Sequence, residues 1–560
     1  MRRFFRHRIL WLLCSSLVIA GSVTGEDGYQ RGIVASVNRQ ASEAGLAVLK
    51  SGGNAVDAAV AVGFALGVVD GHNSGIGGGC FMLIRRPGGQ VVAIDGRETA
   101  PAKATRDMYV REGRADTRLS QSGALACGVP GEVAAFDYAI GHFGRKSMAE
   151  VLAPAIRLAE EGFVLNAMQA DRIASAKENL ERFESSKAVF FRKGRPLAAG
   201  ERLKQKDLAA TYRHLAKDGV DWFYRGGFAR AAGDWMAANG GILSSADFST
   251  YNVVIREPVE TTYRGWRVVS FPPPGSGGVH LLQMLNILES FPVAAMDSAA
   301  RTHVFAEAMK LAFADRAHWL GDPDFARVPR GLLSKSYAAG LMSRISMDHA
   351  GKVPGHGMPP GWESDVFKKH TTHFCVADDE GNWVACTATI NTTYGSKVVV
   401  PGTGVVLNNE MDDFAIQPGV RNAFGLVGAD ANCVEPGKRP LSSMSPTIVL
   451  KDGEPVLALG AAGGPKIITT VLTELVQVLD LGMTPAQAVA APRVHHQWSP
   501  DELIVEEETP VELRTALEAR GHVLKTQKAI STSQIIQRPV RGKGFIGAGD
   551  PRVGGVVAGW

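Results

Sequence analysis

The chain of 560 residues lacks several common signatures of function. It has no CxxC pair, no HExxH sequence and no GxSxG elbow, so the usual zinc, dithiol and serine-hydrolase motifs are missing. The glycine cluster 75–79 has Cys80 where a dinucleotide-binding loop needs its last glycine, and Lys466 lacks the following Ser or Thr of a P-loop. We therefore predict no cofactor and no metal, and assign the glycine clusters to tight backbone packing.

An excess of charge and a disulfide framework are also missing. The net charge is +4 without a basic run beyond the N-terminus, which argues against nucleic-acid binding. Beyond the N-terminal segment five cysteines remain, an odd number without regular spacing. Whether Cys375 and Cys386, on neighbouring predicted strands, form a pair is left open. The adjacent His495 and His496 on a strand would point to opposite faces, so we assign them a structural role and not a metal site.

No apolar run is long enough to span a bilayer. The N-terminal sequence MRRFFRHRILWLLCSSLVIAGSVTGED has a basic head and an apolar run from Ile9 to about Ala20, the pattern of an export signal. We expect a signal peptide over 1–25, a periplasmic or secreted protein, and no membrane anchor after its removal. The export route, general or twin-arginine, stays open.

The remaining sequence alternates helical and strand patterns, which predicts an α/β fold. A helix, a Gly-Gly stop, an Asn54 cap and a second helix are expected within 38–67, followed by two strands within 80–101. Helical patterns fill about 130–345, and strand–turn–strand patterns follow from 371, including 404–414 and 445–464. Two helices are expected within 467–494. The Pro/Gly-rich stretch 352–370 is typical of a flexible connector.

Several motifs resemble those of the γ-glutamyltranspeptidase family. They are TTHFCVADDEGNWVACTATINTTYG (371–395), LNNEMDDF (407–414), KRPLSSMSPT (438–447) and GAAGGPKIITTV (460–471), with GGNAVDAAVA, GIGGGCFML, DGRETAP, FPPPGSGGVH and DRAHWLGDPDF upstream. They occur in the family's order over nearly all of the mature chain. The resemblance implies an N-terminal-nucleophile hydrolase with an αββα sandwich. It also implies self-cleavage into a helix-rich large subunit (26–370) and a small catalytic subunit (371–560), which stay together as one intertwined heterodimer.

The resemblance makes Thr371 the nucleophile and His370–Thr371 the cleavage site. Inside a chain this hydroxyl has no base nearby, because the adjacent nitrogen is an amide. Cleavage frees an α-amine with a pKa of roughly 7.7–8.0, which can help to remove the hydroxyl proton. Thr372 is the rival nucleophile. Thr389, two residues from Asn391 and hence on the same strand face, is expected to bond the nucleophile.

The other implied residues suit a γ-glutamyl substrate, which carries a carboxylate and an ammonium beside the amide. Arg97, Ser442 and Ser443 match the family's carboxylate site. Asn391, Glu410 and Asp413 match the ammonium side, where some members have Gln in place of Glu410. Gly463 and Gly464 would offer N–H groups to the oxyanion. The segment 420–433 resembles the lid loop of bacterial members, which often have Tyr in place of Phe424.

We therefore expect a self-processing γ-glutamyl hydrolase and transferase that acts on glutathione and related compounds and passes the acyl group to water, an amino acid or a peptide. One alternative is a β-lactam side-chain acylase on the same scaffold. Another is an unprocessed, non-catalytic binding protein. The sequence leaves open the physiological substrate and acceptor, the balance of hydrolysis and transpeptidation, the effect of Phe424 and any higher oligomeric state.

Overall fold

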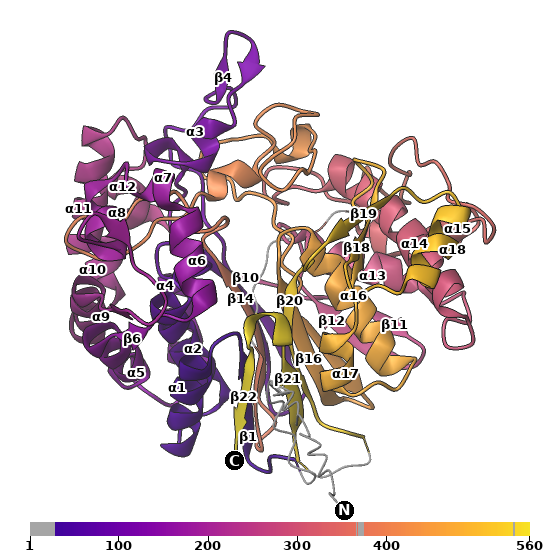
Figure 1. The fold of residues 1–560 in the computed structure, drawn as a ribbon, viewed down its shortest axis with the longest axis horizontal. Helices are drawn as coiled ribbons and strands as arrows, with labels where there is room; N and C mark the ends of the chain where they lie inside the picture. Colours follow the sequence, from indigo (N-terminus) through magenta and orange to yellow (C-terminus); the bar gives the residue numbers. More distant parts are fainter. Residues whose placement is uncertain (1–27, 366, 368–374, 541–543) are drawn as a thin grey trace, which may run out of the picture.

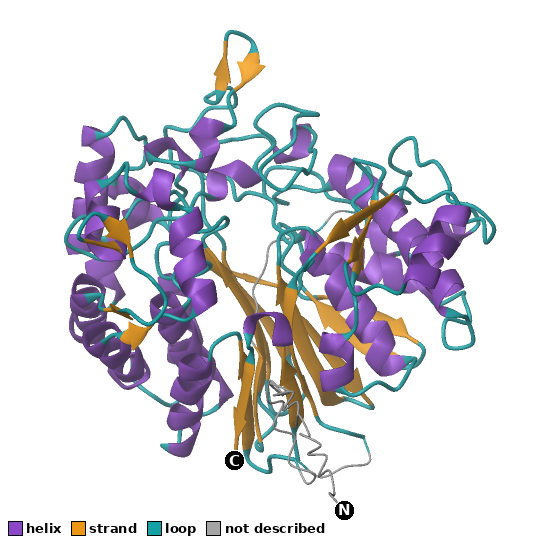
Figure 2. Ribbon diagram, viewed as in Figure 1, coloured by secondary structure: helices purple, strands orange, loops and turns teal. Residues whose placement is uncertain are grey.

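Two β-sheets lie face to face, and helices cover the outer side of each (Figures 1 and 2). The computed structural model describes residues 28–365, 367, 375–540 and 544–560. The four-layer αββα arrangement confirms the predicted fold class. The predicted signal peptide, His370, Thr371 and Thr372 lie outside the described residues.

The first sheet has seven antiparallel strands drawn from both ends of the chain. Their order is β10 (Val254–Arg256), β3 (Val91–Gly96), β2 (Gly79–Arg85), β14 (Trp383–Thr389), β13 (Cys375–Asp378), β1 (Gly32–Ser36) and β22 (Val556–Gly559). β2 pairs with β14, and β13 pairs with β1. Strands from before and after position 370 are therefore neighbours within one sheet.

The second sheet repeats this mixture. It consists of β11 (Val259–Tyr263), β12 (Trp266–Ser270), β15 (Thr447–Lys451), β16 (Glu454–Ala462), β20 (Thr532–Gln537) and β21 (Ile546–Gly549), in that order. β12, from the first part of the chain, pairs with β15 from the second. Both sheets thus depend on both of the predicted subunits.

Strand β2 shows why its sequence is apolar throughout. Phe81 and Leu83 belong to the core that contains the second sheet, whereas Cys80, Met82 and Ile84 belong to the core under the helices. Alternate side chains of a strand point to opposite faces, so a sheet covered on both sides needs apolar residues at every position.

Helices of the outer layers pack on the sheets they cover. The seven-stranded sheet is covered by α1 (Arg39–Lys50), α2 (Ala55–Val69) and α4 (Glu132–Phe143), with α5 (Met148–Glu161) and α9 (Lys206–Asp218) further out. The six-stranded sheet is covered by α13 (Ser276–Leu288), α16 (Lys466–Leu479) and α17 (Pro485–Ala490), with α14 (Ser298–Trp319) packed on α13. The predicted helix pairs are confirmed, and Asn54 caps α2 in a capping box with Asp57.

The remaining elements are short or peripheral. The helices are α3 (Arg118–Gln121), α6 (Ala167–Ser175), α7 (Lys177–Leu180), α8 (Glu184–Phe190), α10 (Val220–Tyr224), α11 (Gly227–Ala238), α12 (Ser245–Thr250), α15 (Lys335–Met342) and α18 (Val511–Ala519). The strands are β4 (Val110–Arg111), β5 (Arg114–Ala115), β6 (Phe163–Val164), β7 (Phe191–Arg192), β8 (Arg195–Pro196), β9 (Arg202–Leu203), β17 (Val494–His495), β18 (Leu503–Glu506) and β19 (Leu524–Gln527). Helices α1 to α15 all precede residue 343, so the predicted large subunit is helix-rich, as expected.

The glycine cluster 75–79 packs tightly against the main chain, as predicted. A Cβ atom on Gly77 would lie 2.0 Å from the carbonyl oxygen of Val406, and one on Gly78 would lie 2.0 Å from that of Thr389. These contacts exclude any side chain. The cluster therefore lets two chain segments approach each other beside the end of β14.

The prediction of strand–turn–strand structure over 404–414 is wrong: the segment contains one isolated β-bridge, at Val406, and no strand. Glu410–Asp413 forms a 3₁₀-helix. The side chain of Asn408 accepts hydrogen bonds from the backbone N–H groups of Gly128 and Glu410, and it donates to the carbonyl of Gly77. Side-chain bonds to the main chain of this kind compete with a strand ladder.

The structure also describes part of the connector and the five cysteines beyond the N-terminal segment. The described part of the connector, 352–365, is irregular as expected, but it is anchored: Trp319 donates to the carbonyl of Gly357 and Trp498 to that of Val353. The five described cysteines form no disulfide. Cys375 and Cys386 face the two different cores, on opposite sides of their sheet, and so cannot pair.

Candidate active site

A pocket of about 300 Å³ gathers the predicted site residues. It lies at the C-terminal ends of β14 and β16, beside the segment that follows β3 and the segment that precedes β15. Nine predicted residues line it: Arg97, Thr389, Asn391, Glu410, Asp413, Ser442, Ser443, Gly463 and Gly464. Although these residues span more than 360 positions of the chain, the fold brings all nine together.

Ser442 and Ser443 form the side of the pocket that carries hydroxyl groups, named the donor side below, and both are buried. The N–H of Ser442 donates to the carbonyl of Pro274 (2.8 Å), and its own carbonyl accepts the N–H (2.7 Å) and the hydroxyl (2.7 Å) of Ser276. The segment is thus fixed to the start of α13. Behind it, Arg316 of α14 donates from Nη2 to Ser443 Oγ (3.1 Å) and from Nε to Ser276 Oγ (2.9 Å).

Arg97 joins the two sides of the pocket. It directly follows β3 and is fully buried. Nη2 donates to Asp413 Oδ2 (2.6 Å), Nη1 lies 2.8 Å from Glu410 Oε2, and Nε donates to the carbonyl of Pro440 (3.1 Å). Burial alone would lower the pKa of Arg97, but the carboxylates around it raise that pKa above its ordinary value.

Glu410 and Asp413 form the acceptor side. Burial raises the pKa of Glu410 well above its ordinary value despite the attraction of Arg97, and burial likewise raises the pKa of Asp413. Glu98, next to Arg97, is also buried, and its pKa is raised to about 8 by burial. Glu410 Oε1 has no hydrogen-bond donor among the described residues. One guanidinium therefore faces three carboxyl groups, an arrangement that a further cation would complete.

Thr389 and Asn391 form the edge of the pocket at the end of β14. Asn391 has φ = 76°, in the left-handed region, which asparagine tolerates better than most residues. Its N–H donates to Thr389 Oγ1 (2.8 Å), and its side-chain nitrogen donates to the carbonyl of Asn409 (2.9 Å). The turn fixes both side chains.

Gly463 and Gly464 form the third side, between β16 and α16, with φ of +146° and +62°. Within the described chain, no acceptor is found for either N–H. The N-terminus of α16 adds a partial positive charge there. Phe424 of the lid segment lines the pocket, and a Cβ on Gly464 would lie 2.6 Å from its ring carbon Cδ1. Phe424 therefore covers this glycine loop.

The sequence interpretation missed three residues at the site: Asn73, Glu98 and Arg316. Asn73 lines the pocket, and its carbonyl accepts the N–H of Ile390. Glu98 and Arg316 lie within the motifs DGRETAP and DRAHWLGDPDF, which carry the family resemblance. Their place inside these motifs was the signal available in the sequence.

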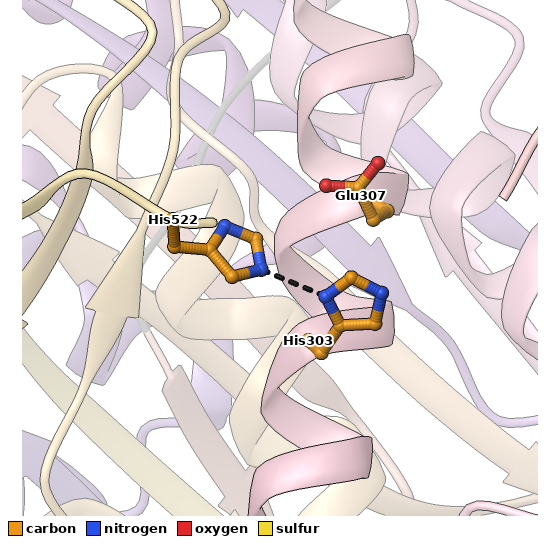
Figure 3. A group of neighbouring side chains, drawn as sticks. All are labelled: His303, Glu307 and His522. Atoms are coloured by element: carbon orange, nitrogen blue, oxygen red, sulfur yellow. Dashed lines mark hydrogen bonds between the residues drawn. The ribbon is translucent and has the colours of Figure 1, made fainter. Parts of the chain in front are cut away.

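One group of described side chains has the composition of a metal site: His303, Glu307 and His522 (Figure 3). The two imidazole rings meet edge-on, with their planes at 66° and His303 Nδ1 2.8 Å from His522 Nε2. His303 Nε2 is 2.7 Å from the carbonyl oxygen of Ser346. The histidines are therefore hydrogen-bonded to each other and to the main chain.

Both carboxylate oxygens of Glu307 also have partners. Oε1 lies 2.8 Å from Lys310 Nζ, and Oε2 accepts the N–H of Gly351 (2.9 Å). A lysine ammonium beside the carboxylate opposes binding of a metal cation. The group instead fastens the segment 346–351 to α14. The predicted structural role of His495 and His496 also fits, since both are buried and bonded to Thr469 and Asp501.

The family model described as gamma-glutamyltranspeptidase matches residues 41–560. The chain belongs to the γ-glutamyltranspeptidase family, a family of enzymes. It is 46% identical over 528 residues to a glutathione hydrolase proenzyme from Escherichia coli, covering 93% of this chain and 90% of the relative. A glutathione hydrolase proenzyme from Bacillus subtilis is 38% identical, with 92% of each chain covered. The acylase ACY 1 proenzyme of a Pseudomonas strain is 41% identical, with 88% of this chain and 87% of the relative covered.

Solved structures agree with this assignment. The cephalosporin acylase from Bacillus halodurans superposes with a TM-score of 0.85 at 31% identity, covering 95% of this chain and 96% of the other. The γ-glutamyltranspeptidase of Helicobacter pylori superposes with a TM-score of 0.56 at 41% identity, covering 57% of this chain and 93% of the other. Both names, hydrolase and acylase, thus occur among family members similar to this chain.

Proposed function

We propose that this protein is a self-processing γ-glutamyl hydrolase and transferase that acts on glutathione and related γ-glutamyl compounds. The observation that carries the proposal is the pocket, in which buried hydroxyl donors and buried carboxylate acceptors are joined by Arg97. The α-carboxylate of a γ-glutamyl group would lie against Ser442, Ser443 and Arg97. Its ammonium would lie against Glu410 and Asp413.

The nucleophile in this proposal is Thr371. Its hydroxyl attacks the γ-carbonyl carbon, and Gly463 and Gly464 donate to the oxyanion. The C–N bond then breaks, and the departing amine takes up the proton that the hydroxyl has lost. Water or an amine adds to the resulting ester, and the oxygen of Thr371 recovers a proton as the γ-glutamyl group leaves.

We infer that the hydroxyl of Thr389 bonds the nucleophile. Thr389 is the last residue of β14 and lines the pocket. The N–H of Asn391 donates to Thr389 Oγ1, so the hydroxyl of Thr389 still has its own hydrogen to donate.

Self-cleavage at His370–Thr371 would give a large subunit, 26–370, and a small subunit, 371–560. The pairings of β2 with β14, of β1 with β13 and of β12 with β15 would hold the two pieces together as a heterodimer. Residues 1–25 would direct export and be removed, giving a periplasmic or secreted enzyme. Over the described residues, no helix combines the length and apolarity needed to cross a membrane.

A Thr371→Ala variant tests the assignment, with Thr372→Ala as its matched control. Thr371→Ala is expected to give one uncut polypeptide on a denaturing gel and no turnover of a γ-glutamyl anilide. Thr372→Ala is expected to give two bands and to remain active, with a small fragment that begins at Thr371. A cut and active Thr371→Ala protein would refute the assignment, and an uncut, inactive wild type would favour the binding-protein alternative.

The acylase alternative follows from the acylase names among the relatives. A glutaryl group has a carboxylate but no ammonium. It would leave Arg97 as the cation that Glu410 and Asp413 share in the buried pocket, without the ammonium that a γ-glutamyl group adds. We therefore expect the γ-glutamyl anilide to be turned over at least about a hundredfold faster than the glutaryl anilide, as for the loss of a buried charge pair. The reverse order would establish the acylase.

A further inference from the structure

Arg316 lies behind the donor side of the pocket, which Ser442 and Ser443 form, and has no role in the mechanism above. It is on α14, 4% exposed, and is surrounded by protein. A buried guanidinium is costly unless its N–H groups and its charge are compensated. Its position therefore calls for an explanation beyond the packing of α14.

The partners of Arg316 are two hydroxyl groups. Nε is 2.9 Å from Ser276 Oγ, and Nη2 is 3.1 Å from Ser443 Oγ. The hydroxyl of Ser276 donates onward to the carbonyl of Ser442 (2.7 Å). The guanidinium thus reaches both serines of the pocket, Ser443 directly and Ser442 through Ser276.

The chemistry of these groups fixes the direction of one hydrogen. Arginine can only donate, so Ser443 must accept from Nη2. This bond uses one lone pair of the Ser443 oxygen and leaves its O–H free to donate to a ligand. Ser276 likewise accepts from Arg316 and gives its own hydrogen to the carbonyl of Ser442.

Charge supports the same assignment. Burial lowers the pKa of Arg316 to about 10, with Asp413 opposing the shift, so the side chain is still a cation at neutral pH. It adds a second positive charge, besides that of Arg97, behind the donor side, where the α-carboxylate of the ligand would lie. Lysine has no planar fork and could not hold both serine hydroxyls in this geometry.

We propose that Arg316 is a positioning residue that makes Ser443 a fixed hydrogen-bond donor and so sets the requirement for an α-carboxylate in the ligand. The identity of that ligand rests on the function proposed above. Arg316 itself does not touch the substrate. It acts through Ser443 and through the segment held by Ser276.

The test measures binding, so that it does not depend on turnover. L-Glutamate carries the α-carboxylate, and 4-aminobutyrate is the same molecule without it. Calorimetry on the mature wild type is expected to show glutamate bound at least about a hundredfold more tightly. In Arg316→Met this preference is expected to fall about tenfold, the size of one hydrogen bond to a charged group. Arg316→Lys is expected to be intermediate.

A double-mutant cycle separates positioning from general damage. If Arg316 acts through Ser443, adding Ser443→Ala to Arg316→Met costs much less preference for glutamate than Ser443→Ala costs alone. A thermal melt of each variant checks folding. Equal weakening of both ligands, or full additivity in the cycle, would overturn the inference.

The outcomes also separate this inference from the proposed function. If glutamate selectivity depends on Arg316 in a protein that does not cleave γ-glutamyl anilides, the proposed function is wrong and the inference about Arg316 holds. If the protein cleaves γ-glutamyl anilides and its selectivity is unchanged in Arg316→Met, the proposed function holds and the inference about Arg316 is wrong.

Discussion

The two charged sides of the pocket are built differently. On the donor side, Ser442 and Ser443 are held by Arg316, Ser276 and the main chain of Pro274. On the acceptor side, the buried Glu410 Oε1 lacks a donor among the described residues, and the pKa values of Glu410 and Asp413 are raised by burial. The donor side is thus held in place before a ligand binds, with the Ser443 O–H left to donate to it, whereas the acceptor side, already bonded to Arg97, gains a second cation from the ligand.

This contrast assigns different tasks to the two sides. A side that is already hydrogen-bonded orients the ligand without reorganising, which favours a single bound geometry. Buried carboxyl groups with raised pKa values ionise at a cost, and the ligand's ammonium offsets that cost by attracting the charged form. Orientation therefore comes mainly from the serines, and selection for an amino acid head comes mainly from the carboxyl groups.

Replacing Arg97 should have the largest effect, because this residue bonds both carboxyl groups of the acceptor side and the carbonyl of Pro440, just before the serines of the donor side. Arg97→Met leaves Glu410 and Asp413 buried without their cation, a change that typically costs about 3–5 kcal/mol. We expect kcat/KM for a γ-glutamyl anilide to fall at least about a hundredfold and the melting temperature to fall as well. Arg97→Lys is the matched control and should retain more of both. Activity within about twofold of wild type in Arg97→Met would show that the two sides do not depend on this residue.

Gly464→Ala should come next, because it disturbs the glycine loop and the lid together. The new Cβ would lie 2.6 Å from Phe424 Cδ1 at a residue with φ = +62°. We expect kcat to fall about a hundredfold, the usual cost of a displaced oxyanion donor, with a smaller change in KM. Adding Phe424→Ala removes the clash but not the backbone strain, so activity should recover only in part. Full recovery would mean that the strain at Gly464 is unimportant.

Glu410→Gln isolates the acceptor side and should have a smaller effect. The amide oxygen can still accept, so we expect KM to rise about fivefold at pH 8, or ~1 kcal/mol, the scale of one hydrogen bond. In the wild type, KM should rise as the pH falls, because protonation of Glu410 at its raised pKa removes the negative charge. The variant should show a weaker dependence. An identical pH profile in both proteins would exclude Glu410 as the titrating group.

The same variant has a predicted effect on stability. The folded-state pKa of Glu410 is raised, so its contribution to stability is complete below the ordinary glutamate pKa and is lost as the pH rises through the raised value. Glutamine has no such loss. We therefore expect the melting temperature of Glu410→Gln, relative to wild type, to increase with pH. A decrease would reverse the sign of the proposed shift.

Phe424→Ala should have the smallest effect, because the Phe424 ring lies against Gly464, whereas the lid segment's bond to the acceptor side comes from Asn422, which donates to Asp413. Loss of the ring opens the pocket to water. The fraction of acyl groups passed to an added amino acid, as opposed to water, is expected to fall about twofold, as for a minor packing contact. Product analysis by chromatography measures it. Phe424→Leu is the control and should keep most of the wild-type fraction.

Much of the fold could be predicted from the sequence because its signals are local. Asn54 with Asp57 marks the start of α2, and the acidic turn after Asp378 marks the hairpin of β13 and β14. The positions of β1 beside β13 and of β22 beside β1 could not be predicted, because they depend on pairing between distant segments. The 3₁₀-helix at Glu410–Asp413 was missed because side chains of neighbouring asparagines, and not strand pairing, determine it.

The site divides in the same way. The family resemblance supplied the nine pocket residues, since each lies in a short motif. Arg316 lies in a motif too, but its role depends on its distance from Ser443, and the two residues are far apart in sequence. Only the packing of α14 against the start of α13 brings the guanidinium to that hydroxyl. A motif identifies such a residue without revealing its partner.

The alternation of the two predicted subunits within both sheets has a consequence for dissociation. Because β2 pairs with β14, and β12 with β15, neither polypeptide can leave without breaking both sheets. After cleavage, dilution alone should not separate the pieces, and heat should release them in the same transition that melts the core. The free energy of dissociation of the two pieces and the free energy of unfolding then belong to the same transition.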